Sequence, residues 1–305
     1  MSLSVKNLRK VFGEKTAVED LSFEMNESGV FGLIGTNGAG KTTTIRMILG
    51  IITPDGGSAK WDGNIITRET LSFGYMPEER GLYMKNKVID QLCYFGMLRG
   101  MTKANAIEAA DKLLDRLAVT EYRNMNAEKL SKGNQQKIQL IATLIHDPLL
   151  IFLDEPFSGL DPLNAEMLRE LIDELVKAGK FIVMSSHQMN TVEEYCENLI
   201  ILHHGKTMLN GNLRDIKKSY GHTNLTLKAD TENSSEGSII TKAKDFGIEL
   251  LDTTADEMHF KIGGDKQAQE FLRSLVNSEI YPIKYEIREP SLNEIFIEKV
   301  GGSVQ

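Results

Sequence analysis

The stretch Gly35-Thr36-Asn37-Gly38-Ala39-Gly40-Lys41-Thr42 decides the fold expected for this chain. It follows the apolar run 30–34 and precedes a predicted helix at 43–49, which ends at Gly50. Strand, glycine-rich loop and helix in this order are the context that a phosphate-binding loop requires. Glycines let backbone N–H groups surround phosphate oxygens, and the N-terminus of the helix adds partial positive charge. A chance glycine-rich turn, the alternative, does not explain the flanking strand and helix.

The side chains of this loop predict ATP and Mg²⁺ as ligands. Lys41 supplies a full charge to the β- and γ-phosphate oxygens and belongs to the predicted catalytic set, while the Thr42 hydroxyl is a predicted Mg²⁺ ligand. The predicted nucleotide contacts of this segment are Gly35, Thr36, Asn37, Gly38, Ala39, Gly40, Lys41, Thr42 and Thr43.

A second segment, Leu149-Leu150-Ile151-Phe152-Leu153-Asp154-Glu155-Pro156, supplies carboxylates. Its apolar run predicts a strand buried on both faces, as in a parallel sheet covered by helices. Ligands bind at the C-terminal ends of such strands. We therefore expect Asp154 to orient Mg²⁺ through its waters and Glu155 to accept a proton from the attacking water. Taken alone, the pair is also compatible with a solvated acidic turn.

A third element resembles one family. Leu130-Ser131-Lys132-Gly133-Asn134 is similar to the LSGGQ signature of the ATPase subunits of ABC (ATP-binding cassette) transporters. The resemblance implies that Ser131 and Gly133 of one subunit cap the ATP held by another subunit. Asp161, in Ser158-Gly159-Leu160-Asp161, resembles the D-loop that joins the two sites.

Two further positions follow the same family pattern. His187, after the apolar run 181–184, resembles the switch histidine at the γ-phosphate, and Phe12 matches the aromatic residue that stacks on adenine. The resemblance spans about residues 1–217. It implies an α/β P-loop NTPase fold: an ABC cassette with a RecA-like core, a β-subdomain and a helical arm at about 79–147.

Three positions depart from the family pattern. Lys132 replaces glycine, Asn134 replaces glutamine, and Glu78 stands where the Q-loop has glutamine. Lys132 could add charge toward phosphate or point to solvent, and solvent is the favoured alternative. Glu78 can still hold a Mg²⁺-bound water. The run Glu78-Glu79-Arg80-Gly81-Leu82-Tyr83 resembles the sodium-export and drug-export branch of ABC-2-type exporters.

In the family, a groove of the helical arm receives a short helix of the membrane subunit. Tyr83, Tyr94 and Phe95 are candidates to line that groove here, and packing within the arm is the alternative for each of them.

Residues 218–305 predict a second, small α+β domain. Strands and helices alternate there in the order β-α-β-β-α-β, which suggests a ferredoxin-like fold. Ser291 and Glu294 form a capping box that opens a last helix. No catalytic group is evident in this domain, so a dimerising or regulatory role and an inert appendage both remain open.

Composition limits the partners and the location. The 305 residues hold 41% hydrophobic and 26% charged residues, with only Cys93 and Cys196 as cysteines. No apolar run approaches the ~20 residues that span a bilayer, and the N-terminus lacks a signal-peptide core. We expect a cytoplasmic protein, peripheral on the cytoplasmic face of the cell membrane. The net charge of −8 argues against a nucleic-acid partner.

Taken together, the resemblance implies an ATP-binding and ATP-hydrolysing subunit that powers an ABC-2-type exporter. Its implied partners are transmembrane permease subunits and a second copy of this chain, with ATP-driven dimer closure and hydrolysis-driven reopening. The alternative is an ABC ATPase that acts without a membrane partner in translation or DNA maintenance. A P-loop kinase is disfavoured, because it has no use for the signature or the D-loop. The sequence does not indicate the cargo.

Overall fold

The structure is a computed structural model that describes residues 1–67, 70–79, 81–229, 236–254 and 257–301. The chain forms two compact units, Met1–Asn210 and Gly211–Gln305. This division precedes helix α7 (Leu213–Tyr220), whereas the sequence analysis placed the boundary after residue 217. The two units are described in turn.

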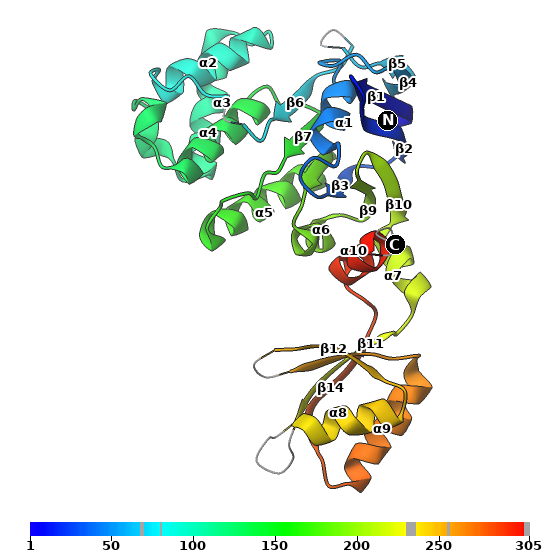
Figure 1. Cartoon of the computed structure of the whole chain (residues 1–305). Helices are drawn as coiled ribbons and strands as arrows, with labels where there is room; N and C mark the ends of the chain where they lie inside the picture. Colours follow the sequence, from blue (N-terminus) through cyan, green and yellow to red (C-terminus); the bar gives the residue numbers. More distant parts are fainter. Residues whose placement is uncertain (68–69, 80, 230–235, 255–256, 302–305) are drawn as a thin grey trace. The chain divides into compact units, whose positions relative to one another are not determined.

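A six-stranded sheet forms the centre of the N-terminal unit (Figure 1). In sheet order its strands are β10 (Lys206–Asn212), β9 (Asn198–His203), β3 (Gly29–Gly35), β8 (Phe181–Ser186), β7 (Leu150–Asp154) and β6 (Phe73–Met76). The pairs β3–β9, β3–β8, β7–β8 and β6–β7 are parallel. Every residue of β7 and β8 is buried, as their continuous apolar runs predicted.

A second, antiparallel sheet packs against the first and forms the β-subdomain. Its strands, in sheet order, are β2 (Lys15–Met25), β1 (Leu3–Phe12), β4 (Gly56–Trp61) and β5 (Asn64–Ile65). One apolar core connects the two sheets. In it the rings of Phe23 and Phe31 stack with centroids 4.3 Å apart, and Trp61 meets Phe181 edge-on at 4.9 Å.

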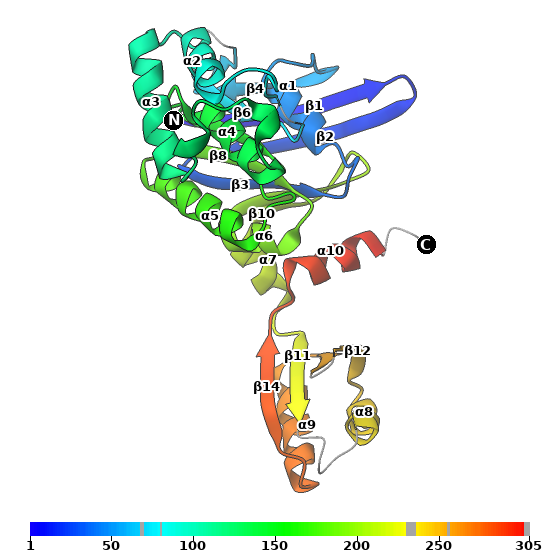
Figure 2. The same cartoon turned by 90° about the vertical axis from the view of Figure 1, so that its left-hand side faces the viewer.

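Helices cover both faces of the central sheet. Helix α1 (Lys41–Ile48) buries Ile45 and Ile48 in the core between the two sheets. Helices α5 (Pro162–Lys177) and α6 (Met189–Tyr195) lie on the other side of β3 (Figure 2). Gly32 lets α6 pack close, because a Cβ there would be 3.0 Å from the Cys196 sulfur.

The helical arm consists of α2 (Val88–Leu98), α3 (Lys103–Arg116) and α4 (Lys132–Leu144), with short 3₁₀ turns at Thr120–Tyr122 and Ala127–Lys129. Apolar residues of these helices are buried, including Leu92, Ala106, Ala110 and Leu114. Arg116 at the end of α3 binds Glu174 of α5, with its Nη2 2.7 Å from Oε1. The arm is therefore tied to the helix that follows the D-loop.

The C-terminal unit contains a four-stranded antiparallel sheet and four helices among its described residues. Its elements are α7, β11 (Asn224–Ala229), α8 (Glu236–Asp245), β12 (Glu249–Thr253), β13 (Met258–Lys261), α9 (Asp265–Asn277), β14 (Pro282–Arg288) and α10 (Leu292–Gly301). The sheet order β12-β13-β11-β14 is the ferredoxin-like arrangement that the element order suggested. Leu225, Leu227, Phe260 and Phe271 belong to its separate apolar core.

The capping box predicted for the last helix is present. The Ser291 backbone N–H donates to Glu294 Oε2 at 2.7 Å, and the Glu294 N–H donates to Ser291 Oγ at 3.2 Å. Both guanidinium nitrogens of Arg288 donate to the same carboxylate, each at 2.8 Å. Burial alone would raise the pKa of Glu294, but these hydrogen bonds prevail and lower it to about 2.

This arrangement predicts a pH-dependent stability of α10. The carboxylate stabilises the folded state above the ordinary pKa of 4.5, and the stabilisation is lost as the pH falls through about 2. We expect Glu294→Gln to lower the local unfolding free energy of α10 by roughly 1–2 kcal/mol at pH 7. Hydrogen–deuterium exchange of α10 between pH 7 and pH 3 measures the difference in local unfolding free energy between the parent protein and the variant. This difference should become smaller below pH 4.5.

Glu298→Gln is the matched control on the same helix. Its carboxylate is half exposed and pairs with Lys261 at 3.5 Å. Its replacement should therefore change the local unfolding free energy of α10 by well under ~1 kcal/mol. An equal effect of the two variants would contradict the role given to the capping box.

Candidate active site at the phosphate-binding loop

The predicted loop joins β3 to α1 and is closed by backbone contacts. The Ala39 N–H donates to the Thr36 carbonyl at 3.1 Å, and the Gly205 N–H donates to the Ala39 carbonyl at 3.1 Å. Gly40 precedes α1 with φ +108°, and a Cβ there would collide with the Ala17 carbonyl oxygen. Only glycine meets both requirements at position 40.

Lys41 forms a buried ion pair with Glu155. Lys41 Nζ lies 3.0 Å from Glu155 Oε1 and donates to the Gly35 carbonyl at 2.7 Å. Both residues are 6% exposed. A buried charge is tolerated only when it is paired, so each of these two groups compensates the other.

Glu155 is held in an unusual backbone conformation at the end of β7. Its φ of +53° lies in the left-handed region, which non-glycine residues seldom adopt. The Glu155 N–H donates to the Ser185 hydroxyl at 3.0 Å and lies 3.2 Å from the Ser185 carbonyl. His187 binds the other carboxylate oxygen through Nδ1 at 2.8 Å and its backbone N–H at 3.3 Å. The carboxylate is therefore contacted by both the predicted lysine and the predicted histidine.

Asp154 is fully buried and only half satisfied. Its Oδ1 accepts the Ser185 hydroxyl at 2.5 Å, while the buried Oδ2 has no hydrogen-bond partner among the described residues. An unpaired carboxylate oxygen is costly in the interior. A Mg²⁺-bound water would satisfy it, so the predicted metal role fits this site.

Ser185 was not anticipated from the sequence. It pairs with Asp154 in the register of β7 and β8, so its hydroxyl contacts Asp154 and also receives the Glu155 N–H. The available signal was positional, because Ser185 ends an apolar strand two residues before His187.

These groups border a cavity of about 320 Å³, here called the loop cavity. Phe12 stands at its rim, with 48% of its surface exposed, and Lys10 Nζ lies 5.4 Å from the ring centroid. The lining residues are Phe12, Lys15, Ala17, Asn37, Gly38, Ala39, Gly40, Lys41, Thr42, Thr43, Glu78 and Glu155. Lys15 and Ala17 were not predicted. Gly35 and Thr36 form the base of the loop through their carbonyls to Lys41.

The signature residues lie elsewhere. Ser131 caps the N-terminus of α4, where its hydroxyl accepts the Asn134 N–H at 3.3 Å. A Cβ on Gly133 would lie 3.3 Å from Asn164 Nδ2, which donates to the Asp161 carboxylate at 2.6 Å. Ser131, Gly133 and Asp161 do not line the loop cavity of their own chain. Lys132 is exposed, as expected from the sequence.

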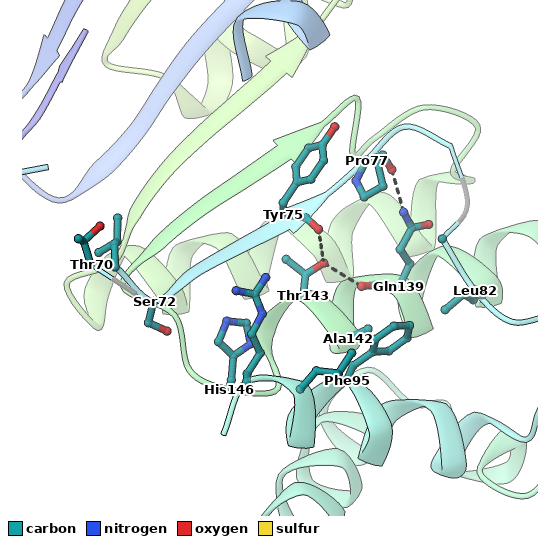
Figure 3. A pocket seen from close by; sticks show the side chains of 14 residues that line it. Thr70, Ser72, Tyr75, Pro77, Leu82, Phe95, Gln139, Ala142, Thr143 and His146 are labelled. Carbon is teal, nitrogen blue, oxygen red and sulfur yellow. Dashed lines mark hydrogen bonds between the residues drawn. The ribbon is translucent and has the colours of Figure 1, made fainter. Parts of the chain in front are cut away.

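A larger cavity of about 670 Å³, here called the arm cavity, lies between β6, α2 and α4 (Figure 3). Phe95 lines it, while Tyr83 and Tyr94 are about half exposed and pack against Phe95. His146 also lines it and contacts the Phe73 carbonyl through Nε2 at 3.1 Å. Burial lowers the pKa of His146, so its neutral form is favoured.

Two absences hold for the part of the chain that the structure describes. No helix in those ranges has both the length and the apolar character needed to cross a bilayer. In the same parts of the chain, no group of three or more His, Cys, Asp or Glu side chains is arranged to hold a metal ion.

Comparisons with known proteins agree with this geometry. A family model described as "ABC transporter" matches residues 18–158, and one for the C-terminal domain of "ATP-binding protein DrrA1-3-like" proteins matches residues 211–300. The uncharacterized ABC transporter ATP-binding protein YhaQ of Bacillus subtilis (strain 168) is 44% identical over 304 residues, which is 98% of each chain.

Two further similarities extend the comparison. The linearmycin resistance ATP-binding protein LnrL of the same bacterium is 29% identical over 316 residues, covering 99% of both chains. A solved structure of the ATP binding subunit of an ABC transporter is 31% identical with a TM-score of 0.66, covering 72% of this chain and 93% of the other. The resemblance found in the sequence is therefore confirmed. This chain belongs to the ATP-binding proteins of ABC transporters, its C-terminal domain matches the DrrA1-3-like family model, and it is an ATPase whose hydrolysis of ATP is coupled to transport.

Proposed function

We propose that two copies of this chain close over shared ATP and so drive an ABC-2-type exporter. The observation that carries the proposal is that two predicted anion-binding sites lie apart from each other in one chain. The loop cavity has one of them, and the exposed N-terminus of α4, with Ser131 and Gly133, is the other. Because α4 does not line the cavity of its own chain, a second copy is needed to bring the two together.

Within one copy, ATP binding separates the buried ion pair of Lys41 and Glu155. The adenine stacks on the exposed ring of Phe12, and the phosphates enter the loop at residues 35–43. Lys41 then turns from Glu155 to the β- and γ-phosphate oxygens. The exchange frees the Glu155 carboxylate to accept a proton from the attacking water, and His187 stays beside the γ-phosphate.

Thr42, Glu78 and Asp154 are the residues that would hold Mg²⁺. The buried, unpartnered Oδ2 of Asp154 supports this assignment, as does the position of Glu78 and Thr42 on the cavity wall. When bound, the ion neutralises charge that develops on the phosphates during transfer. Ser185 keeps the Asp154 carboxylate fixed while these groups act.

The second copy completes the site. Its Ser131 hydroxyl and the backbone N–H groups at the start of α4 approach the γ-phosphate, and Asp161 joins the two sites across the interface. ATP binding closes the homodimer. Hydrolysis weakens the bridge between the copies and reopens it.

The output is movement of transmembrane permease subunits. LnrL, which is similar over its whole length, is by its name a resistance protein, and this supports export of a compound from the cell. We place this chain in the cytoplasm, on the cytoplasmic face of the membrane, with the helical arm turned to the permease. Nucleic acid is not among the proposed partners.

Dimer closure is tested with a variant of Glu155. Glu155→Gln keeps the shape of the side chain but removes the base, so it should bind ATP–Mg²⁺ and hydrolyse it at least ~100-fold more slowly. Gel filtration with ATP should show a dimer. Adding Ser131→Arg in the same chain should abolish the dimer while leaving ATP binding to the monomer intact.

Mixing two inactive variants tests whether the site is shared. Lys41→Ala and Ser131→Arg subunits should each be inactive alone. A mixed dimer has one site with an intact Lys41 and an intact Ser131 from opposite copies, so mixing should restore measurable hydrolysis. Hydrolysis by Ser131→Arg at the parent rate would remove the shared-site model.

A second prediction concerns Ser185. Ser185→Ala deprives the buried Asp154 Oδ1 and the Glu155 N–H of a partner, and we expect hydrolysis to fall roughly 10- to 100-fold. Ser186→Ala is the control, because its buried hydroxyl accepts the Gln188 N–H at 2.9 Å instead. Equal rates for both variants, at equal thermal stability, would argue against the role of Ser185.

The membrane partner is tested by capture. Glu155→Gln with ATP, added to detergent-solubilised membranes of the source cell, should retain a multi-span permease that mass spectrometry identifies. Release of this permease by EDTA would link its capture to the closed dimer. Recovery of ribosomal or nucleic-acid-bound proteins alone would instead favour an ABC ATPase that acts without a membrane partner.

A further inference from the structure

Gln139 joins helix α4 to the segment that carries Glu78. Its side chain is 5% exposed, and its Nε2 donates to the Pro77 carbonyl at 2.8 Å (Figure 3). The same Nε2 donates to the Glu79 carbonyl at 3.1 Å. These two carbonyls flank Glu78 on either side. One amide group therefore fixes the backbone both before and after this residue.

The attachment continues one turn later on the same helix. The Thr143 hydroxyl lies 3.4 Å from the Tyr75 carbonyl and donates to the Gln139 carbonyl at 2.9 Å (Figure 3). Strand β6 and the residues that follow it thus lie along α4, whose N-terminus is capped by Ser131. Backbone carbonyls held by a rigid helix leave the segment little freedom to shift.

Glu78 itself is exposed and lines the loop cavity, two residues after the end of β6 and outside any helix or strand. A carboxylate on a long side chain acts on a metal only where its backbone is placed within reach. Gln139 does not line the loop cavity. Any influence of this residue on nucleotide binding must therefore pass through the backbone that it holds.

We propose that Gln139 is a positioning residue for Glu78, which fixes the Pro77 and Glu79 carbonyls so that the Glu78 carboxylate faces the Mg²⁺–ATP site. The proposal rests on the metal role proposed above for Glu78. Helix α4 then has two roles. It presents the signature to the partner copy, and it holds the backbone on both sides of Glu78 in its own copy.

The test measures binding, not turnover. Gln139→Met keeps the volume of the side chain and removes its N–H groups. The dissociation constant of a non-hydrolysable ATP analogue is measured for the full-length protein in Mg²⁺ and in EDTA. We expect the gain in affinity from Mg²⁺ to fall roughly three- to tenfold, with affinity in EDTA unchanged. Gln139→Glu, which also lacks the N–H groups, makes the same test if the methionine variant does not fold.

Gln135 offers a matched control. It is 4% exposed on the same helix, and its Nε2 donates to the Ala127 carbonyl at 2.9 Å and the Leu130 carbonyl at 3.2 Å, away from Glu78. Gln135→Met should lower thermal stability about as much as Gln139→Met and leave the Mg²⁺ gain intact. A loss of the gain in both variants would show a general structural effect and overturn the proposal.

Two readouts separate this inference from the metal role of Glu78. If Gln139 acts through Glu78, the double variant Gln139→Met, Glu78→Ala should lose no more of the Mg²⁺ gain than Glu78→Ala alone. Amide exchange at residues 76–79 should rise in Gln139→Met and not in Gln135→Met. Faster exchange with no effect of Glu78→Ala on Mg²⁺ would refute only the metal role; unchanged exchange and an unchanged gain would refute the positioning role.

Discussion

The buried ion pair between Lys41 and Glu155 is the interaction on which the rest of the site depends. An ammonium and a carboxylate, each 6% exposed, are stable here because they lie 3.0 Å apart and have further hydrogen-bond partners. In the proposed mechanism, Lys41 stays paired with Glu155 until phosphate oxygens replace the carboxylate as its partner. One contact therefore stabilises the empty site and, in the proposed mechanism, makes the base available only when ATP is present.

The order of the strands explains how these groups come together. Strands β3, β8 and β7 are neighbours in a parallel sheet, so their C-terminal ends lie side by side. The phosphate loop follows β3. Asp154 ends β7 and Glu155 follows it, while Ser185 is the last but one residue of β8 and His187 follows that strand. Because all residues of β7 and β8 are buried, the sheet cannot shift without disturbing its core, and the polar groups at its edge keep their places.

A second constraint is that helix α4 connects the signature to the segment that carries Glu78. Helix α4 begins at the exposed signature and ends beside β6, so a single rigid element is in contact with the proposed partner surface and with the segment that carries Glu78. The arm is in turn connected to α5 through Arg116 and Glu174. These links give the cassette physical routes by which closure at the nucleotide can reach the arm.

The sequence by itself determined the elements whose signal is local. The glycine pattern at 35–42, the apolar strands at 149–153 and 181–184, the capping box at Ser291 and the βαββαβ order all appear in the structure. They depend on φ angles, hydrophobic periodicity and short-range hydrogen bonds, which neighbouring residues encode. Only the tertiary structure decided that Ser185 contacts Asp154, that Lys41 pairs with Glu155 and that Gln139 holds the backbone around Glu78. Those contacts join residues 31, 114 and about 60 positions apart along the chain, and strand register and helix packing set their geometry.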